Sequence, residues 1–539
     1  MIARRARRGP LFVWLLASIV ALLLAYAVTQ LLLTSAGHDQ TWYLYAAERY
    51  LAGIQLYGPQ IVETNPPLII WFSTIPVAIS RLLHIGPYAG FELLLSFMVL
   101  GSILWCLRIF RKSDTGLSAL SLVYLGSALL VVEFGQFAGS PIGGVTFGQR
   151  EQLLIILIFP YVIARALRTA DGLTLAERCL LGVAAGLGVC FKPQQALILA
   201  SLELFFVLYT RRLRNLFAPE TLAAFLTCVC YVLLLRQLAP RYITQVIPLL
   251  QNAYWAVGGI SVASILKTYI HFNIYVLLFL LAGFLLFRRV RNRAPAYALL
   301  CCAAASFAVY LLQRKGWMYQ ARPARAFLLF LVFYVLFLFI KPAIDWLDTV
   351  LRTRPAAAGS AFAIALILLA VQAVQIRRIM MRPRLIWSLA VPPVDQIVGQ
   401  LKPGTPVSVL SDSLAVFPTI YRHHLIWASR FPCLWLLPAI VRNEMGSSDP
   451  DVVFKRLPPE TVASLSDLQR KDTAEDLDSW QPPIVLVEQC DVQHPCAFLE
   501  GYDFDMLEWF LKSPRFQSAW SHYTHESDIP GFAVYKRED

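Results

Sequence analysis

Charged residues are scarce in this chain. Only 15% of its 539 residues are Asp, Glu, Lys or Arg, whereas 58% are hydrophobic. Soluble domains carry about 25% charged residues, so this composition excludes an ordinary soluble globule. The cysteines and histidines show no spacing typical of a zinc site, and no internal repeat or low-complexity segment is present.

Acidic residues are scarcest in the first part of the chain. Residues 1–384 contain 35 Lys and Arg against 13 Asp and Glu, whereas residues 385–539 contain 12 against 21. The basic surplus occurs in short clusters between apolar runs, which is typical of the cytoplasmic loops of membrane proteins. Because the polar tail is acidic, we expect no nucleic-acid partner.

Apolar runs recur along residues 1–384, many of them close to the length of about 20 residues that crosses a bilayer. If the arginine clusters face the cytoplasm, the pattern predicts about eleven transmembrane helices, a cytoplasmic N-terminus and an outer C-terminal domain. The cluster RRIMMRPR (377–384) opposes this arrangement, because it would lie outside. The expected spans are 11–34, 90–110, 117–133, 152–167, 179–191, 195–210, 220–237, 268–287, 295–312, 325–341 and 359–376.

The segment 68–83 is apolar but short, contains Pro76 and ends near Arg81. We therefore expect juxtamembrane helices on the outer face within residues 35–89, and no crossing by 68–83. The predicted fold is a polytopic α-helical membrane protein (1–384) of the inner (plasma) membrane, followed by a soluble α/β domain (385–539).

Within that domain, strands are expected at 406–413, 482–490 and 531–538, and a helix within 504–516. Cys490 and Cys496 form a disulfide if the tail is extracytoplasmic, or remain thiols if it is not.

Six carboxylates fall on the outer face in this topology, which is more than helix capping requires. Asp39 begins an amphipathic helical pattern that stops near Gly53. Its carboxylate is either an N-cap or a general base held at the membrane surface. The six are Asp39, Glu48, Glu63, Glu92, Glu133 and Glu151.

Basic residues on the same face are also few. Lys192, in the turn VCFKPQQALI, either extends its ammonium to the headgroups or binds an anion. The run QRKGWMYQARPAR contains Lys315, Tyr319 and Arg322, and is either an interfacial belt or a phosphate-binding patch.

The pattern D-Q-x-x-Y-x-x-x-A-x-x-x-L-x-G (39–53), followed by LYG (56–58) and NPPL (65–68), resembles the first outer loop of GT-C glycosyltransferases. It is most similar to the aminoarabinose transferases of lipid A and to the protein O-mannosyltransferases. The resemblance implies inverting transfer of a sugar from a polyprenyl-phosphate donor, with an acid of this loop in catalysis.

Residue by residue, the resemblance places Asp39 at the catalytic acid and Glu151, in GQREQLL, at a second acidic position. Lys192 stands at a K-G-P turn that faces the donor phosphate, although Pro193 follows it directly here. KGWMYQARP (315–323) resembles a late outer loop that contacts the phosphate.

The predicted site therefore has Asp39 and Glu151 as catalytic residues. Lys192, Arg150, Lys315, Tyr319 and Arg322 are predicted to bind the donor phosphate, and Tyr43, Glu48, Tyr57, Glu63 and Asn65 to line the substrate site. No cofactor is expected, because outward cations can replace a metal, although a divalent metal is not excluded.

The expected partners are a polyprenyl-phosphate sugar, membrane lipids and a glycan, lipid or protein acceptor. A transporter or flippase of lipid-linked sugars, and a polymerase or ligase with a diphosphate-linked donor, remain as alternatives. The sequence identifies neither the sugar nor the acceptor.

Overall fold

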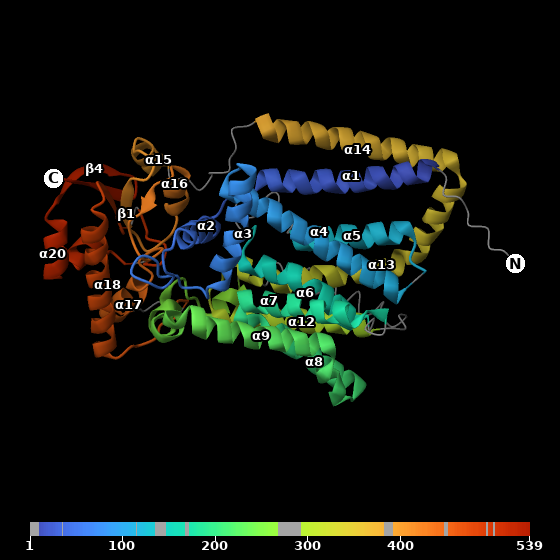
Figure 1. Ribbon diagram of the computed structural model, residues 1–539, viewed down its shortest axis with the longest axis horizontal. Helices are drawn as coiled ribbons and strands as arrows, with labels where there is room; N and C mark the ends of the chain where they lie inside the picture. Colours follow the sequence, from blue (N-terminus) through green and yellow to red (C-terminus); the bar gives the residue numbers. More distant parts are fainter. Residues whose placement is uncertain are drawn as a thin grey trace.

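The protein is a long bundle of helices with a small α/β domain at one end (Figure 1). This computed structural model describes residues 10–34, 36–114, 116–134, 147–167, 172–267, 293–381, 392–446, 451–491, 494–499 and 502–538. The N-terminal end of α1 and the α/β domain lie at opposite ends of the bundle (Figure 1).

Apolar helices build the bundle. They are α1 (Pro10–Leu33), α4 (Pro87–Ser113), α5 (Ala119–Phe134), α6 (Arg150–Ala166), α7 (Leu175–Phe191), α8 (Ala196–Thr210), α9 (Pro219–Leu238), α12 (Ala294–Gln313), α13 (Arg322–Thr353) and α14 (Pro355–Met381). α1 has 24 residues without a charge and is about 36 Å long, enough to cross a hydrocarbon core of about 30 Å.

Seven segments of the described chain are long and apolar enough to cross a membrane, which confirms a polytopic membrane protein. They are Leu11–Leu33, Pro87–Ser113, Pro193–Thr210, Pro219–Leu238, Ala294–Gln313, Met318–Thr353 and Pro355–Met381. α5, α6 and α7 are shorter, with 16 or 17 residues, but lie in the same bundle (Figure 1). The expected span 268–287 lies outside the described residues, so the number eleven stays a prediction.

The helix that contains the expected span 325–341 is longer than that span. α13 continues through Pro342 to Thr353, so residues 342–353 form helix and not a connecting loop. In this extension, Lys341 and Asp345 form an ion pair at 2.9 Å, at the i,i+4 spacing that stabilises exposed helices.

Small residues allow two helices of the bundle to approach closely. A methyl group at Gly182 of α7 would lie 2.1 Å from the carbonyl oxygen of Glu220 in α9. At Gly186 it would lie 2.7 Å from the carbonyl oxygen of Ala224. Glycine is required at both positions, as is common where membrane helices meet.

Two further helices, α2 (His38–Leu51) and α3 (Leu68–Leu83), lie at the end of the bundle next to the α/β domain (Figure 1). α3 has 16 residues and is about 24 Å long, too short to cross a typical bilayer core. Residues 35–89 thus contain the expected helices, and their position at the outer face of the membrane stays a prediction.

The α/β domain contains one five-stranded sheet. Its strands, in spatial order, are β2 (Ile426–Trp427), β1 (Pro406–Leu410), β3 (Ile484–Glu488), β5 (Phe532–Arg537) and β4 (Tyr523–Ile529). β2, β1 and β3 are parallel, whereas β5 pairs antiparallel with β3 and β4. The helices of the domain are α15 (Pro392–Val398), α16 (Phe417–Arg422), α17 (Leu437–Met445), α18 (Pro459–Trp480), α19 (Met506–Leu511) and α20 (Pro514–Trp520).

The three strands expected from the sequence are present as β1, β3 and β5, and the expected helix is split into α19 and α20. β4 and α18 were not predicted. Cys490 and Cys496 form a disulfide, whereas the side of the membrane on which they lie stays a prediction. The predicted domain boundary at 384/385 lies outside the described residues.

α2 connects the two parts of the molecule. Its Trp42 and Tyr45 pack edge to face against Phe417 of α16, with ring centroids 5.1 and 5.4 Å apart. The hydroxyl group of Tyr45 accepts a hydrogen bond from the backbone N–H of Trp427 at 3.2 Å. The helix that carries Asp39 is therefore fixed to the α/β domain.

Candidate active site

Two adjoining cavities lie at the end of the bundle, and the smaller of them is also lined by α2 and the α/β domain. The larger, which we call the apolar cavity, has a volume of about 830 Å³, and the smaller, the polar cavity, about 460 Å³. Both are lined by Thr64, Asn65, Arg150 and Tyr254, so these four residues mark the junction between them.

The apolar cavity is lined largely by aliphatic side chains. Val189, Val232, Leu235, Ile247 and Leu250 belong to α7, α9 and α10 (Ile247–Ala253). Its charged lining residues are all cations, namely Arg150, Lys192, Arg236 and Lys315. Such a surface suits an apolar chain that ends in an anionic group.

Lys192 is held by a buried ion pair. It follows α7, whose last residue is Phe191, and its ammonium group donates to the Glu151 carboxylate near the start of α6. The two side chains are 2% and 0% exposed, so both depend on this pairing. Burial lowers the pKa of Lys192 to about 8, although the Glu151 charge opposes that shift.

Lys315 lines the apolar cavity but is also bound to a turn. Its Nζ donates to the carbonyl oxygens of Tyr254 at 2.5 Å and of Val257 at 2.6 Å. Burial lowers its pKa to about 7. In this conformation the ammonium group therefore holds the 254–257 turn that forms part of the cavity wall.

Asp39 lines the polar cavity from the first turn of α2. The N-cap position belongs to Gly37, so the alternative of an N-cap carboxylate is wrong. Asp39 Oδ2 accepts a hydrogen bond of 2.8 Å from Nε2 of Gln149, and the Asp39 side chain remains 23% exposed. This carboxylate is anchored and still accessible, as a general base must be.

Glu63 is the second carboxylate of the polar cavity, and both of its oxygens accept hydrogen bonds. Its Oε1 accepts hydrogen bonds from the backbone N–H of Asn65 at 2.8 Å and from the side chain of Asn65 at 2.6 Å. The indole N–H of Trp42 donates to Oε2. Burial raises the pKa of Glu63, and these bonds partly oppose the rise. Glu63 thus orients Asn65, which also lies 3.4 Å from the hydroxyl group of Tyr43.

Arg150 begins α6 and lines both cavities. Its guanidinium Nε makes no hydrogen bond within the part of the chain that the structure describes. A cation with a free donor at the junction of the cavities is suited to a phosphate shared by both.

The structure separates the predicted residues into two groups. Asp39, Tyr43, Glu63, Asn65, Arg150, Lys192, Lys315 and Tyr319 line one or both cavities. Glu48, Tyr57, Glu151 and Arg322 are not among the described lining residues. Glu48 accepts a hydrogen bond from Tyr421 of α16, Tyr57 donates to the carbonyl oxygen of Asn65, and Arg322 donates to that of Phe134. Tyr57 thus supports the lining residue Asn65, and Glu151 supports the lining residue Lys192.

The sequence did not indicate several lining residues. Gln149 fixes Asp39, and Tyr254 lies at the junction. The α/β domain contributes Leu414, Pro432, Cys433, Trp435 and Phe498 to the polar cavity. The aromatic and proline-containing run FPCLW (431–435), which follows β2 after three residues, is a signal that could have indicated this wall.

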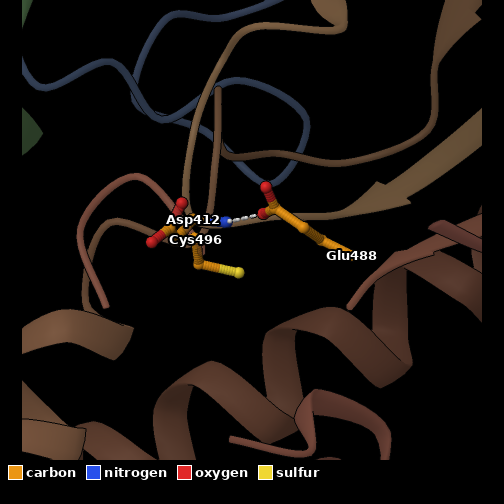
Figure 2. A group of neighbouring side chains, drawn as sticks. All are labelled: Asp412, Glu488 and Cys496. Carbon is orange, nitrogen blue, oxygen red and sulfur yellow. Dashed lines mark hydrogen bonds between the residues drawn. The ribbon is translucent and has the colours of Figure 1, made fainter. Parts of the chain in front are cut away.

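A group of possible metal ligands lies behind this wall. Ligand atoms of Asp412, Glu488 and Cys496 lie within 4.8 Å of one another (Figure 2). Because Cys496 is bonded to Cys490, it has no thiolate to offer. The donor set therefore consists of two carboxylates, and Glu488 already accepts a hydrogen bond of 3.2 Å from the backbone N–H of Asp412 (Figure 2).

Asp412 fastens the loop that carries Phe498. Its Oδ2 accepts hydrogen bonds from the backbone N–H groups of Phe498 at 2.7 Å and Leu499 at 3.0 Å. The observed contacts thus explain this cluster as a loop anchor.

Substitution of Glu488 by Gln is expected to stabilise the α/β domain at alkaline pH. Burial, together with the Asp412 charge, raises the pKa of Glu488 to about 7 in the folded state. The folded state therefore binds more protons than the unfolded state, and wild-type stability falls as pH rises from about 4.5 to about 7. In the variant the free energy of unfolding does not fall in this way, so above pH 7 the variant should be more stable than the wild type by about 1–3 kcal/mol. Thermal unfolding should show a higher midpoint for the variant at pH 8 and equal midpoints near pH 4. Equal midpoints at pH 8 would contradict the assignment.

No protein-family model matches the chain, and no curated protein is significantly similar to it in sequence. Among solved structures, it is similar to ArnT from Cupriavidus metallidurans, in a crystal structure bound to undecaprenyl phosphate. The TM-score is 0.52 and the sequence identity 14%, and the match covers 97% of each chain.

The chain has a GT-C-like fold. This confirms the resemblance that the 39–68 segment indicated. The match extends over both the bundle and the α/β domain.

Proposed function

We propose that this membrane protein is an inverting glycosyltransferase that uses a polyprenyl-phosphate sugar as donor. The observation that carries the proposal is the junction at Arg150 between an apolar cavity lined by cations and a polar cavity lined by Asp39. The likeness to ArnT, whose crystal structure contains undecaprenyl phosphate, supports a lipid-linked donor.

The prenyl chain lies in the apolar cavity, with its phosphate at Arg150 and Lys192 and its sugar at the junction. An acceptor hydroxyl in the polar cavity attacks the anomeric carbon, and its proton passes to the Asp39 carboxylate. The bond between the anomeric carbon and the phosphate oxygen breaks, and the phosphate leaves with the electron pair. Lys192 and Arg150 stabilise the charge that develops on it. Attack from the side opposite the leaving phosphate inverts the anomeric centre.

Glu151 acts as a positioning residue in this scheme. It pairs with Lys192, which keeps the ammonium group charged in a buried place. The GT-C resemblance suggested direct catalysis by Glu151, whereas its ion pair and full burial favour a role through Lys192.

The site is proposed to face outward. A reporter fused after residue 390 should read as extracytoplasmic, because the arginine cluster before α1 is expected to face the cytoplasm and the N-terminal end of α1 lies at the opposite end of the bundle from the α/β domain (Figure 1). A cytoplasmic signal would place the site on the other face.

A transfer assay tests the proposed function. Membranes with the protein, supplied with a radiolabelled undecaprenyl-phosphate sugar and a cell-envelope extract as acceptor, should release the label from the lipid into a polar product. Membranes without the protein should not. A transporter would move the labelled lipid across the membrane with its phosphate–sugar bond intact, so label that stays lipid-linked would contradict the proposal.

A further inference from the structure

The α/β domain contributes one wall of the polar cavity from a single edge of its sheet. Leu414 follows β1, Trp435 follows β2 and Phe498 follows β3. Because these three strands are parallel, their carboxyl ends lie at the same edge. Ligands of open α/β sheets bind at that edge. Here the edge lies across the polar cavity from Asp39.

Aromatic rings dominate this cavity. Trp317 and Tyr319 stack with centroids 5.7 Å apart, and Phe498 lies 6.4 Å from Trp317. All three line the polar cavity and are partly exposed. Trp435 packs behind them at 6.3 Å from Tyr254, and its buried indole N–H has no hydrogen-bond partner in the described part of the chain. Aromatic faces with a few polar groups form a surface for a ring that carries both C–H and O–H groups.

The charged side chains that line the two cavities differ in their balance of sign. The charged lining of the apolar cavity consists of four cations, whereas the polar cavity has the carboxylates Asp39 and Glu63 against one arginine, Arg150, and His38. Phosphate groups require cationic or N–H donors, and carboxylates repel them. The polar cavity thus disfavours a second anion beside the donor phosphate.

From these observations we infer that the polar cavity binds an uncharged carbohydrate acceptor. A sugar ring of the acceptor stacks on Trp317 and Phe498, and one of its hydroxyl groups reaches Asp39. This inference rests on the proposed glycosyl transfer and names the class of its acceptor. It also gives the α/β domain a direct function in choosing that acceptor.

The backbone at Phe498 is anchored to the rest of the α/β domain. Two backbone hydrogen bonds to Asp412 and the Cys490–Cys496 disulfide hold the loop that carries Phe498. An anchored backbone loses less conformational entropy on binding than a free one, which favours affinity for a small neutral ligand.

The test measures binding of free sugars to the full-length protein in lipid nanodiscs by saturation-transfer NMR. The probes are neutral disaccharides of glucose, galactose, mannose and N-acetylglucosamine, with glucose 6-phosphate and mannose 6-phosphate as charged counterparts. At least one neutral disaccharide should bind more tightly than both phosphosugars. Phe498→Ala should weaken that binding about tenfold or more, because it removes a stacking face.

Phe454→Ala is the matched control, since Phe454 is an exposed aromatic residue of the same domain that packs on Trp255 and is not among the described cavity-lining residues. It should bind the disaccharide as the wild type does. Trp317→Leu removes the stacking face that the bundle contributes, and it should also weaken binding of the disaccharide. The test therefore does not depend on the folding of a single variant.

Binding of undecaprenyl phosphate to the same samples separates this inference from the proposed function. Phe498→Ala should leave lipid binding unchanged. If the protein binds the lipid but no neutral disaccharide, the proposal of an uncharged carbohydrate acceptor is wrong and the proposed donor stands. The same holds if the phosphosugars bind more tightly than the disaccharides. Disaccharide binding without lipid binding would overturn the lipid-linked donor instead.

Discussion

Replacement of Asp39 by Asn should lower sugar transfer by a factor of about 100 to 10,000, the range that a general base contributes. Asparagine has nearly the same shape, and its amide oxygen can still accept the hydrogen bond from Gln149. The substitution removes the basicity of the side chain together with its negative charge. The initial rate of label transfer from a polyprenyl-phosphate sugar measures the effect, and donor binding should remain at the wild-type level.

Glu48→Gln is the matched control for this variant. Glu48 lies on the same helix, and its carboxylate accepts a hydrogen bond from Tyr421 at 3.2 Å instead of lining either cavity. Glutamine can accept that bond, so transfer should stay within about threefold of the wild-type rate. Full activity in Asp39→Asn, or equal losses in both variants, would contradict the role of Asp39.

The second large effect concerns Lys192. Lys192→Met leaves the Glu151 carboxylate buried without its cation, and breaking a buried pair in this way costs about 3–5 kcal/mol. We expect a clear fall in the thermal midpoint and loss of undecaprenyl-phosphate binding. That single variant alone does not separate the two effects.

The double variant Lys192→Met/Glu151→Gln separates stability from binding. It removes both charges, so most of the lost stability should return. Binding of undecaprenyl phosphate should remain at least about tenfold weaker than in the wild type, because the cation for its phosphate is still missing. Binding equal to the wild type would show that Lys192 only completes a structural pair.

Much of the bundle was predictable, because hydrophobic length is a local property of the sequence. The runs that became α1, α4, α9 and α12 are long and nearly free of charge, and each is found as a helix close to its expected place. The length of α13 beyond residue 341 was not predictable from apolar runs, because this part of the helix carries the charges of Asp345, Asp348 and Arg352.

The residues of the candidate site were also only partly predictable from the sequence. Asp39 and Asn65 belong to one short motif, and the structure places both at the polar cavity. Phe498 and Trp435 have no such motif. They reach the cavity because the loops after three parallel strands converge and the α/β domain packs on α2. Convergence of this kind depends on tertiary packing, which hydrophobic periodicity does not encode.

The junction of the two cavities at Arg150 has a consequence for the release of the products. If transfer proceeds as proposed, the spent lipid leaves from the apolar cavity into the bilayer, and the glycosylated acceptor leaves from the polar cavity toward water. The two products thus partition into different phases. The reverse reaction would have to bring together one molecule from the bilayer and one from water, as the forward reaction also does, so the direction depends on the free energy of the donor's phosphate–sugar bond and not on partitioning.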